Sequence, residues 1–299
     1  MRIASDEVRN NKIKSYFLIL FFIFLAALLG SVFGLIYGNL YFGIAITIIF
    51  AIFYTLVMYY SGSKMILKMT GARPVTKKEF PYLYHTVEGL AIAAGLPTPK
   101  AYVIDDSALN AFATGRDPEN SSITVTTGLL NKLNRQELEG VIAHEMSHIK
   151  NYDIRFMMLT AVLVGIVTLL SDFLLRSFLW GGMRGRDRNN NQLTILLIVV
   201  GLVLAILTPI VGQLIKLSIS RKREYMADAS GAHLTRYPQG LADALKKISK
   251  DPDPLVDHAN KATAHLFIST PFRKKHSFVA GLFSTHPPIH DRIKRLEDM

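Results

Sequence analysis

The segment 134–149 reads NRQELEGVIAHEMSHI, and it decides how the rest of the chain is interpreted. Asn134 precedes Glu137 by three residues. That is the spacing of a capping box, in which each side chain accepts a hydrogen bond from the other residue's backbone N–H at the start of a helix. Apolar residues at helical spacing follow at Leu138, Val141 and Ile142. We therefore expect a helix here, with an apolar face turned toward a protein core.

On this helix, His144 and His148 are four residues apart and therefore share one face. Glu145 lies between them and completes the pattern His-Glu-x-x-His. In proteins with this pattern, two imidazoles bind zinc and the glutamate acts on the water bound to the metal. A chance occurrence in a chain of this length is on the order of one in a hundred. This rarity disfavours the alternative, a surface helix with two solvated histidines.

A catalytic zinc site needs a third protein ligand and keeps one coordination position open. The metzincin pattern would place that ligand six residues after the second histidine, where this chain has Ile154, so that class is excluded. The best candidate is Glu224, in the helical stretch RKREYMADASG. Asp228, one turn further on the same face, can accept the second ring N–H of a ligating histidine. The alternative is an exposed acidic pair beside Arg221 and Arg223, and the upstream motif argues against it.

Composition excludes several other kinds of chemistry. The chain has 299 residues and no cysteine, so disulfides, Cys-ligated zinc, iron–sulfur clusters and thiol catalysis are ruled out. The length suits one large or two ordinary domains. The hydrophobic content of 50% is ordinary, but the mean hydropathy of +0.26 indicates that the apolar residues are concentrated in particular segments.

Four apolar segments are candidates for membrane spans. No residue between Lys14 and Lys64 is charged, and this stretch of 49 residues is long enough for two helices that cross a bilayer. The turn-prone pair Gly38-Asn39 divides it. Buried core helices are the alternative, and this alternative is stronger for the second pair of segments because the third segment is weaker by length and by charge, with Asp172 near its end. The expected spans are about 16–37, about 40–60, 156–175 and a segment within 188–216.

These segments predict a peptidase domain split by a membrane hairpin. The predicted parts are a first hairpin at 1–64, a first peptidase part at 65–155, a second hairpin at 156–215 and a second peptidase part at 216–299. Two crossings between His148 and Glu224 return the chain to the same side of the membrane, so these residues can meet. Lys and Arg residues beside the first hairpin predict that the peptidase domain and both termini are cytoplasmic. The Arg-rich loop 184–188 of the second hairpin runs against this pattern.

The net charge of +11 admits two classes of partner. The basic residues gather beside the apolar segments and do not form a basic patch with interleaved aromatic residues, so binding of nucleic acid is not expected. Anionic head groups of a lipid bilayer explain the charge more simply.

The motifs AHEMSHIKNYD (143–153) and REYMADASGA (223–232) resemble those of the HtpX group of integral-membrane zinc peptidases, relatives of the CAAX prenyl proteases. NAFATG (110–115) and STHPP (284–288) match further motifs of that group, and the similarity covers nearly the whole chain. The resemblance implies a gluzincin-like fold of the α+β class, mostly helical, with a small antiparallel sheet.

The resemblance also implies one zinc ion per subunit, with His144, His148 and Glu224 as ligands and Glu145 as the catalytic residue. It implies a quality-control role at the cell membrane, with unfolded or damaged membrane proteins cut in segments that face the cytosol. A non-proteolytic zinc-containing scaffold and a processing protease for prenylated substrates are the alternatives.

Further residues are candidates for substrate contacts. Ser122–Thr127 alternates like a strand, and Asn110–Thr114 is expected to form an adjacent edge. The resemblance gives this edge the role of pairing with an extended substrate, and an ordinary buried hairpin is the alternative. His286 precedes two prolines and is a candidate donor to the oxyanion, with His290 as a competitor and a structural histidine as the alternative. The remaining histidines are expected to be surface or packing residues: His85, His233, His258, His265 and His276.

Overall fold

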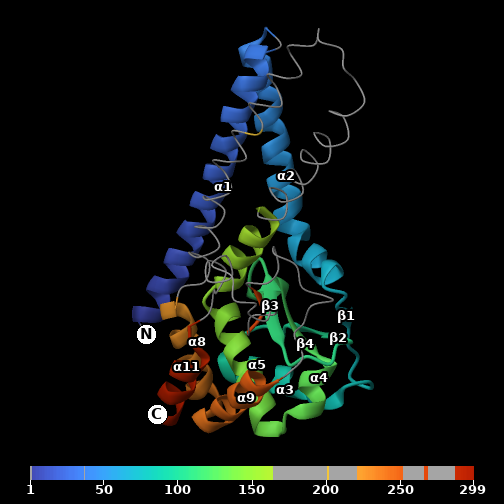
Figure 1. Cartoon of the computed structure of the whole chain (residues 1–299), viewed down its shortest axis with the longest axis vertical. Helices are drawn as coiled ribbons and strands as arrows, with labels where there is room; N and C mark the ends of the chain where they lie inside the picture. The colour runs from blue at the N-terminus through green and yellow to red at the C-terminus, as the bar shows by residue number, and fades with distance from the viewer. Residues whose placement is uncertain (1, 37, 164–200, 202–220, 252–265, 269–286) are drawn as a thin grey trace.

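The computed structural model describes residues 2–36, 38–163, 201, 221–251, 266–268 and 287–299. A long helical hairpin rises from a body that holds a small sheet and the remaining helices (Figure 1). Both chain termini lie at the body, away from the tip of the hairpin.

The hairpin consists of α1 (Arg2–Ile36) and α2 (Leu40–Met69). The predicted turn between them is confirmed: Gly38 has a φ of 77°, and the side chain of Asn39 accepts a hydrogen bond from the backbone N–H of Phe42 at 3.0 Å. A positive φ is available to glycine without steric cost, which explains its place in this turn. Both helices extend beyond the predicted spans, α1 toward its start and α2 toward its end.

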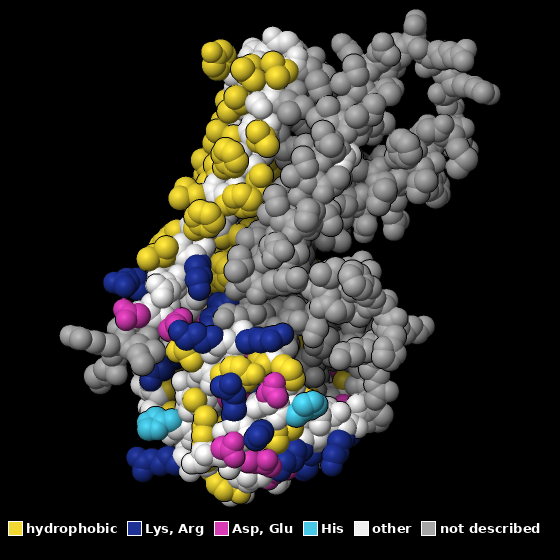
Figure 2. Space-filling model, turned by 60° about the vertical axis from the view of Figure 1, so that its left-hand side comes forward, with side chains coloured by type: hydrophobic (Ala, Val, Ile, Leu, Met, Phe, Trp, Pro, Cys, Tyr) yellow, Lys and Arg dark blue, Asp and Glu magenta, His cyan; other side chains and the backbone are white. Residues whose placement is uncertain are grey.

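Among the described residues, two segments are long and apolar enough to cross a membrane, Asp6–Leu28 and Leu40–Met69. Figure 2 shows hydrophobic side chains along the exposed side of the hairpin, whereas charged side chains gather on the body below it. The predicted second hairpin lies almost entirely outside the described residues. Its first residues, 156–162, continue a helix that begins at residue 153, and they are buried.

The sheet has four strands in the order β1-β2-β4-β3. The prediction of an antiparallel sheet is wrong for one pair, because β2 and β4 are parallel. The reason is topological: β3 and β4 form an antiparallel hairpin, and β4 lies between β3 and β2. The predicted strand and its edge neighbour are present as β4 and β3. The strand bounds are β1 Arg73–Pro74, β2 Lys100–Ile104, β3 Ala111–Gly115 and β4 Ser121–Thr126.

Apolar clusters cover both faces of the sheet. On one face, Ile123 and Val125 of β4 belong to a cluster that includes Val141 and Ile142. On the other face, Phe112 belongs to a cluster that includes residues of both α1 and α2. Burial of β4 on both faces explains why all six of its residues are buried. The base of the hairpin is therefore part of the packed core of the body.

Helices pack around the central helix α5 (Arg135–Lys150). The predicted capping box is confirmed: the Asn134 side chain accepts from the Glu137 backbone N–H at 3.0 Å, and the Glu137 carboxylate accepts from the Asn134 N–H at 2.7 Å. The other elements of the body are α3 Pro81–Ala94, the 3-10 turn Pro118–Asn120, α4 Thr127–Lys132, α8 Arg221–Thr235, α9 Pro238–Lys250 and α11 Ile289–Glu297.

Helix α8 crosses α5 at very short range. A Cβ atom added to Gly231 would lie 3.0 Å from the backbone nitrogen of His144 and 3.2 Å from the carbonyl carbon of Ala143. Only glycine lets the two backbones approach in this way without displacement. This approach holds the acidic residues of α8 next to the histidines of α5.

Candidate active site

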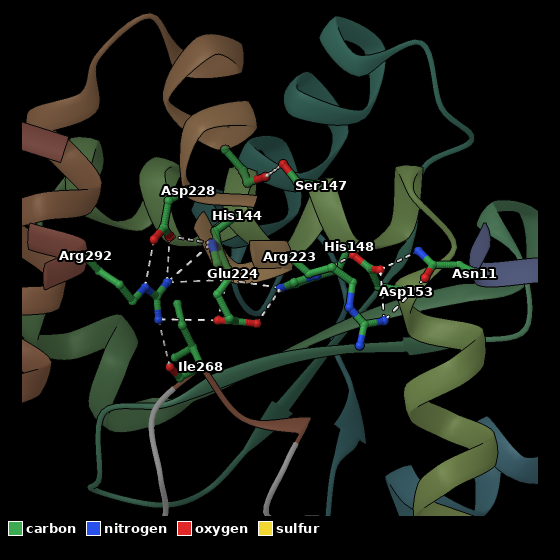
Figure 3. A network of polar contacts seen from close by, with 11 residues as sticks. Asn11, His144, Ser147, His148, Asp153, Arg223, Glu224, Asp228, Ile268 and Arg292 are labelled. Atoms are coloured by element: carbon green, nitrogen blue, oxygen red, sulfur yellow. Dashed lines mark hydrogen bonds and ion pairs between the residues drawn. The ribbon is translucent and has the colours of Figure 1, made fainter. Parts of the chain in front are cut away.

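Three of the predicted site residues meet in the core of the body (Figure 3). His144 and His148 project from α5 and Glu224 projects from α8, and one ligand atom of each lies within 4.8 Å of the others. The two Nε2 atoms are 3.2 Å apart. The carboxylate of Glu224 lies 3.8 Å from His144 Nε2 and 3.6 Å from His148 Nε2. All three side chains are buried.

The hydrogen bonds of the imidazoles fit a metal at this point. His144 Nδ1 lies 2.9 Å from Asp228 Oδ1, and His148 Nδ1 lies 3.0 Å from Asp153 Oδ2. A carboxylate accepts the N–H of Nδ1, so the Nε2 of each neutral imidazole can offer its lone pair to a metal, and the two Nε2 atoms converge. Two nitrogens bound to one tetrahedral zinc ion lie roughly 3.3 Å apart, which the observed 3.2 Å matches.

Asp228 occupies the position expected of a carboxylate that orients a ligand. Arg292 donates to it twice, from Nε to Oδ2 at 2.8 Å and from Nη2 to Oδ1 at 2.7 Å. Burial raises the pKa of Asp228, but the charge of Arg292 and the contact with His144 outweigh it and lower the pKa to about 2. The carboxylate therefore stays ionised and can hold the imidazole of His144 in one orientation.

The sequence analysis missed Arg292, the most deeply buried cation of the site. It comes from α11, is 1% exposed, and also lies 3.6 Å from a carboxylate oxygen of Glu224 and 3.3 Å from the carbonyl oxygen of Ile268. The signal that could have revealed it is the spacing of Ile289, Arg292, Ile293 and Leu296, which puts an arginine on the apolar face of an amphipathic helix.

Replacing Arg292 by methionine is expected to destabilise the protein by about 3–5 kcal/mol, because the buried carboxylates of Asp228 and Glu224 lose their cation. Urea unfolding of the full chain in detergent measures this change. The exposed Lys294 on the same helix provides the matched control, Lys294→Met, which should lie within about 0.5 kcal/mol of the wild type. Equal stability of the two variants would show that Arg292 does not compensate the buried charges.

Asp153, five residues after His148, is a second residue that the sequence analysis did not assign. Burial lowers the pKa of His148, but the hydrogen bond to Asp153 and the charge of Glu224 outweigh it and raise the pKa to about 9. Without a metal this imidazole therefore holds a proton near neutral pH. A metal that binds Nε2 must displace it.

Glu145 is 2% exposed and lies between the two histidines on α5. Burial raises its pKa, and the charges of His144 and His148 oppose this rise without cancelling it. A raised carboxyl pKa brings the group closer to the operating pH, where a general base is most effective.

The remaining predicted residues lie away from this cluster or outside the described residues. Asn110 is buried before β3, and its side-chain oxygen accepts from the backbone N–H of Ala111 at 3.1 Å. His290 is exposed in the first turn of α11, and His85 and His233 are also exposed. His286 and three further histidines, His258, His265 and His276, lie outside the described residues.

The profile of peptidase family M48 matches residues 77–299. The chain belongs to this family. A protein named Protease HtpX homolog from Dictyoglomus turgidum is 47% identical over 294 residues, which cover 98% of this chain and 94% of that protein. A protein of the same name from Streptococcus uberis is 42% identical over 297 residues, which cover 98% and 99% of the two chains.

Among solved structures, Ste24p of S. mikatae matches with a TM-score of 0.49 and 23% identity, covering 83% of this chain and 57% of that one. The predicted membership of the HtpX group is confirmed by the M48 match and by the HtpX homologues. This M48 chain is therefore a metalloprotease of the membrane.

Proposed function

We propose that this M48 peptidase is a zinc-dependent endopeptidase that cuts cytosol-facing segments of misfolded or damaged membrane proteins. In this proposal His144, His148 and Glu224 hold the ion and Glu145 is the general base. The observation that carries it is the convergence of three buried ligand atoms within 4.8 Å, with the second nitrogen of each imidazole held by a carboxylate.

The reaction follows from the positions of these groups. A bound zinc ion supplies Lewis acidity, which lowers the pKa of water from 15.7 to about 7 and polarises a carbonyl group. Asp228 and Asp153 keep the imidazoles in the tautomer that leaves both Nε2 atoms free to bind. Glu145 takes the proton of the attacking water and then delivers it to the amine that leaves. Because Glu145 is buried, bulk water does not weaken the electrostatic interactions of its carboxylate.

The edge of β3 is the proposed binding surface for an extended substrate. The carbonyl oxygen of Ala111 points away from β4 and accepts a hydrogen bond from the backbone N–H of Ile268 at 2.9 Å. This edge therefore already accepts one backbone hydrogen bond from another segment of the chain. Ala113, two residues on, has the same orientation in the pleat, so its backbone groups point to the same side. Pairing through backbone groups reads extended shape more than sequence, which suits an enzyme that clears unfolded segments.

The proposed location is a multi-pass position in the cell membrane, with the peptidase body on the cytoplasmic side. The apolar exposed surface of the hairpin and the charged surface of the body support a bilayer at the level of the hairpin (Figure 2). Lys64 and Lys68, close to the end of α2, support a cytoplasmic body by the positive-inside rule. Anionic lipids are the proposed partners of these charges, and nucleic acid is not.

Removal of the metal tests the proposed function. A chelator should abolish peptidase activity of the purified full chain in detergent, and zinc should restore it. A ligand present at a thousand times its Kd stabilises the folded state by about 4 kcal/mol, so zinc should also raise the Tm of the metal-free protein. Elemental analysis identifies the metal and should find one ion per chain.

The outcomes separate protease from scaffold. Metal-dependent activity supports the proposal, whereas a bound metal without any peptidase activity supports a structural role. A protein that binds no metal and has an unchanged Tm would contradict the assignment of all three ligands.

A further inference from the structure

The first turns of α1 are part of the peptidase body. Asn11, Ser15 and Leu18 form a stripe at helical spacing, and their exposed fractions are 0%, 1% and 1%. Ile13 and Tyr16, on other faces of the same helix, are 56% and 60% exposed. The helix therefore docks through one narrow face before it continues into the hairpin. The first residue of that face, Asn11, carries an amide, although a buried contact between helix and core would ordinarily be apolar.

The amide of Asn11 is engaged in several hydrogen bonds. Its Nδ2 atom donates to Asp153 Oδ1 at 2.6 Å (Figure 3). The same Nδ2 atom donates to the carbonyl oxygen of Asn151 at 2.9 Å. Its Oδ1 atom accepts from Arg223 Nη1 at 3.4 Å. Arg223 also lies 3.5 Å from Asp153 Oδ1. A buried amide with both donors and its acceptor in use has a strongly determined orientation.

These contacts lead directly to the metal cluster. The two oxygens of Asp153 have different partners, because Oδ1 accepts from Asn11 and from Arg223, whereas Oδ2 accepts from His148 at 3.0 Å. The carboxylate is thus held from both sides. A movement of Oδ1 therefore also moves Oδ2, the oxygen that orients the imidazole of His148. Two hydrogen bonds, from Asn11 to Asp153 and from His148 to Asp153, therefore link Asn11 to the imidazole of His148, whose Nε2 atom faces His144.

The turn before Asp153 has a strained backbone conformation. Tyr152, the residue before it, has a φ of 60°, in the left-handed region that a residue with a side chain adopts at a cost. Lys12 of α1 lies over the Tyr152 ring, with Nζ 4.3 Å from the centroid. Two consecutive residues of α1 therefore contact three consecutive residues of this turn, through Asn151 and Asp153 on one side and Tyr152 on the other.

We infer that Asn11 is a positioning residue of the metal site, through which helix α1 sets the orientation of Asp153 and of His148. The inference rests on the proposed function, because it takes His148 to be a metal ligand. It makes the first membrane helix a structural component of the active site, in addition to an anchor.

Replacing Asn11 by leucine tests this inference, since leucine has similar volume and no donor. The loss of an outer partner of a metal ligand typically weakens metal binding about 10–100-fold, and we expect about tenfold for Asn11 because it acts through Asp153. The measurement is zinc affinity of the full-length protein in detergent, by competition with a chelator. The visible absorption of the cobalt-substituted protein should also shift, because the angle of the His148 ligand changes.

The control is Ser15→Ala, on the same buried face one turn further along α1. The Ser15 hydroxyl donates to the backbone carbonyl oxygen of Asn11 at 2.8 Å, within the helix. This variant should keep the wild-type zinc affinity and cobalt spectrum. The Tm of each metal-free protein separates a loss of stability from a loss of positioning. If Asn11→Leu is not recovered folded, Asn11→Ala is used with the same measurements.

Each outcome decides one question. A wild-type protein that binds no zinc overturns both the proposed function and this inference. A wild type that binds zinc, beside an Asn11 variant with unchanged affinity and cobalt spectrum, overturns the inference alone. Equal losses of affinity in Ser15→Ala and Asn11→Leu also overturn it, because they would reflect docking of α1 in general. A weaker affinity and an altered spectrum confined to the Asn11 variant support it.

Discussion

Replacing Glu145 by glutamine is expected to lower kcat about 10²–10⁴-fold, the range that a positioned general base contributes. Glutamine has the shape of glutamate but cannot accept the proton of the attacking water. The metal content should stay at that of the wild type, because the proposed ligand atoms belong to His144, His148 and Glu224. Steady-state cleavage of an unfolded protein substrate and elemental analysis of the same preparation measure the two quantities.

The matched control is Glu139→Gln on the same helix. Glu139 is half-exposed and forms an ion pair with Arg135 at 2.9 Å, so its replacement should leave both activity and metal content unchanged. Peptidase activity of the pure Glu145→Gln protein near the wild-type level would refute the mechanism. A loss of activity together with loss of the metal would instead assign Glu145 a part in the architecture of the site.

Replacing Glu224 by alanine is expected to have the second large effect, a loss of metal and of activity together. The variant removes one of the three proposed ligands and leaves two imidazoles, so zinc affinity should fall by more than the 10–100-fold that is typical when a hydrogen-bond partner of a ligand is lost. Chelator competition on the purified protein measures affinity, and activity at saturating zinc measures what the two histidines can support alone.

Asp243→Asn serves as the control for Glu224→Ala. Its carboxylate also lies on a helix of the peptidase body, but its side chain is 39% exposed and is paired with Lys246. Circular dichroism of the metal-free proteins shows whether α8 remains folded. Full metal content in a folded Glu224→Ala protein would mean that another residue is the third ligand.

The central part of the site was predictable because its chemistry is local in the sequence. The capping box and the His-Glu-x-x-His spacing both act within four residues on one helix, so periodicity alone places them. Glu224 could be predicted because zinc needs a third ligand and because two predicted membrane crossings would return the chain to the same side of the membrane.

The rest depends on contacts between distant segments, which the sequence does not express in its spacing. Arg292 reaches the site across the fold, and Asn11 contacts Asp153 over 142 residues. An arginine on an apolar helix face or an asparagine before a hydrophobic run has many ordinary explanations. The parallel pairing of β2 and β4 depends on which side of β4 its hairpin partner occupies, and strand patterns do not contain that information.

Residues of α1 and of α11 both contact the cluster of His144, His148 and Glu224 or the carboxylates beside it. This has a consequence for biosynthesis. During translation α1 and the histidines of α5 leave the ribosome well before α8, and α11 with Arg292 follows later still. Until then Asp228 and Glu224 lack their buried cation, and the third ligand is not fixed. A nascent chain is therefore expected to stay inactive until α11 has been synthesised. A peptidase whose site is completed at this stage is not expected to cut its own chain before α11 has folded against α8.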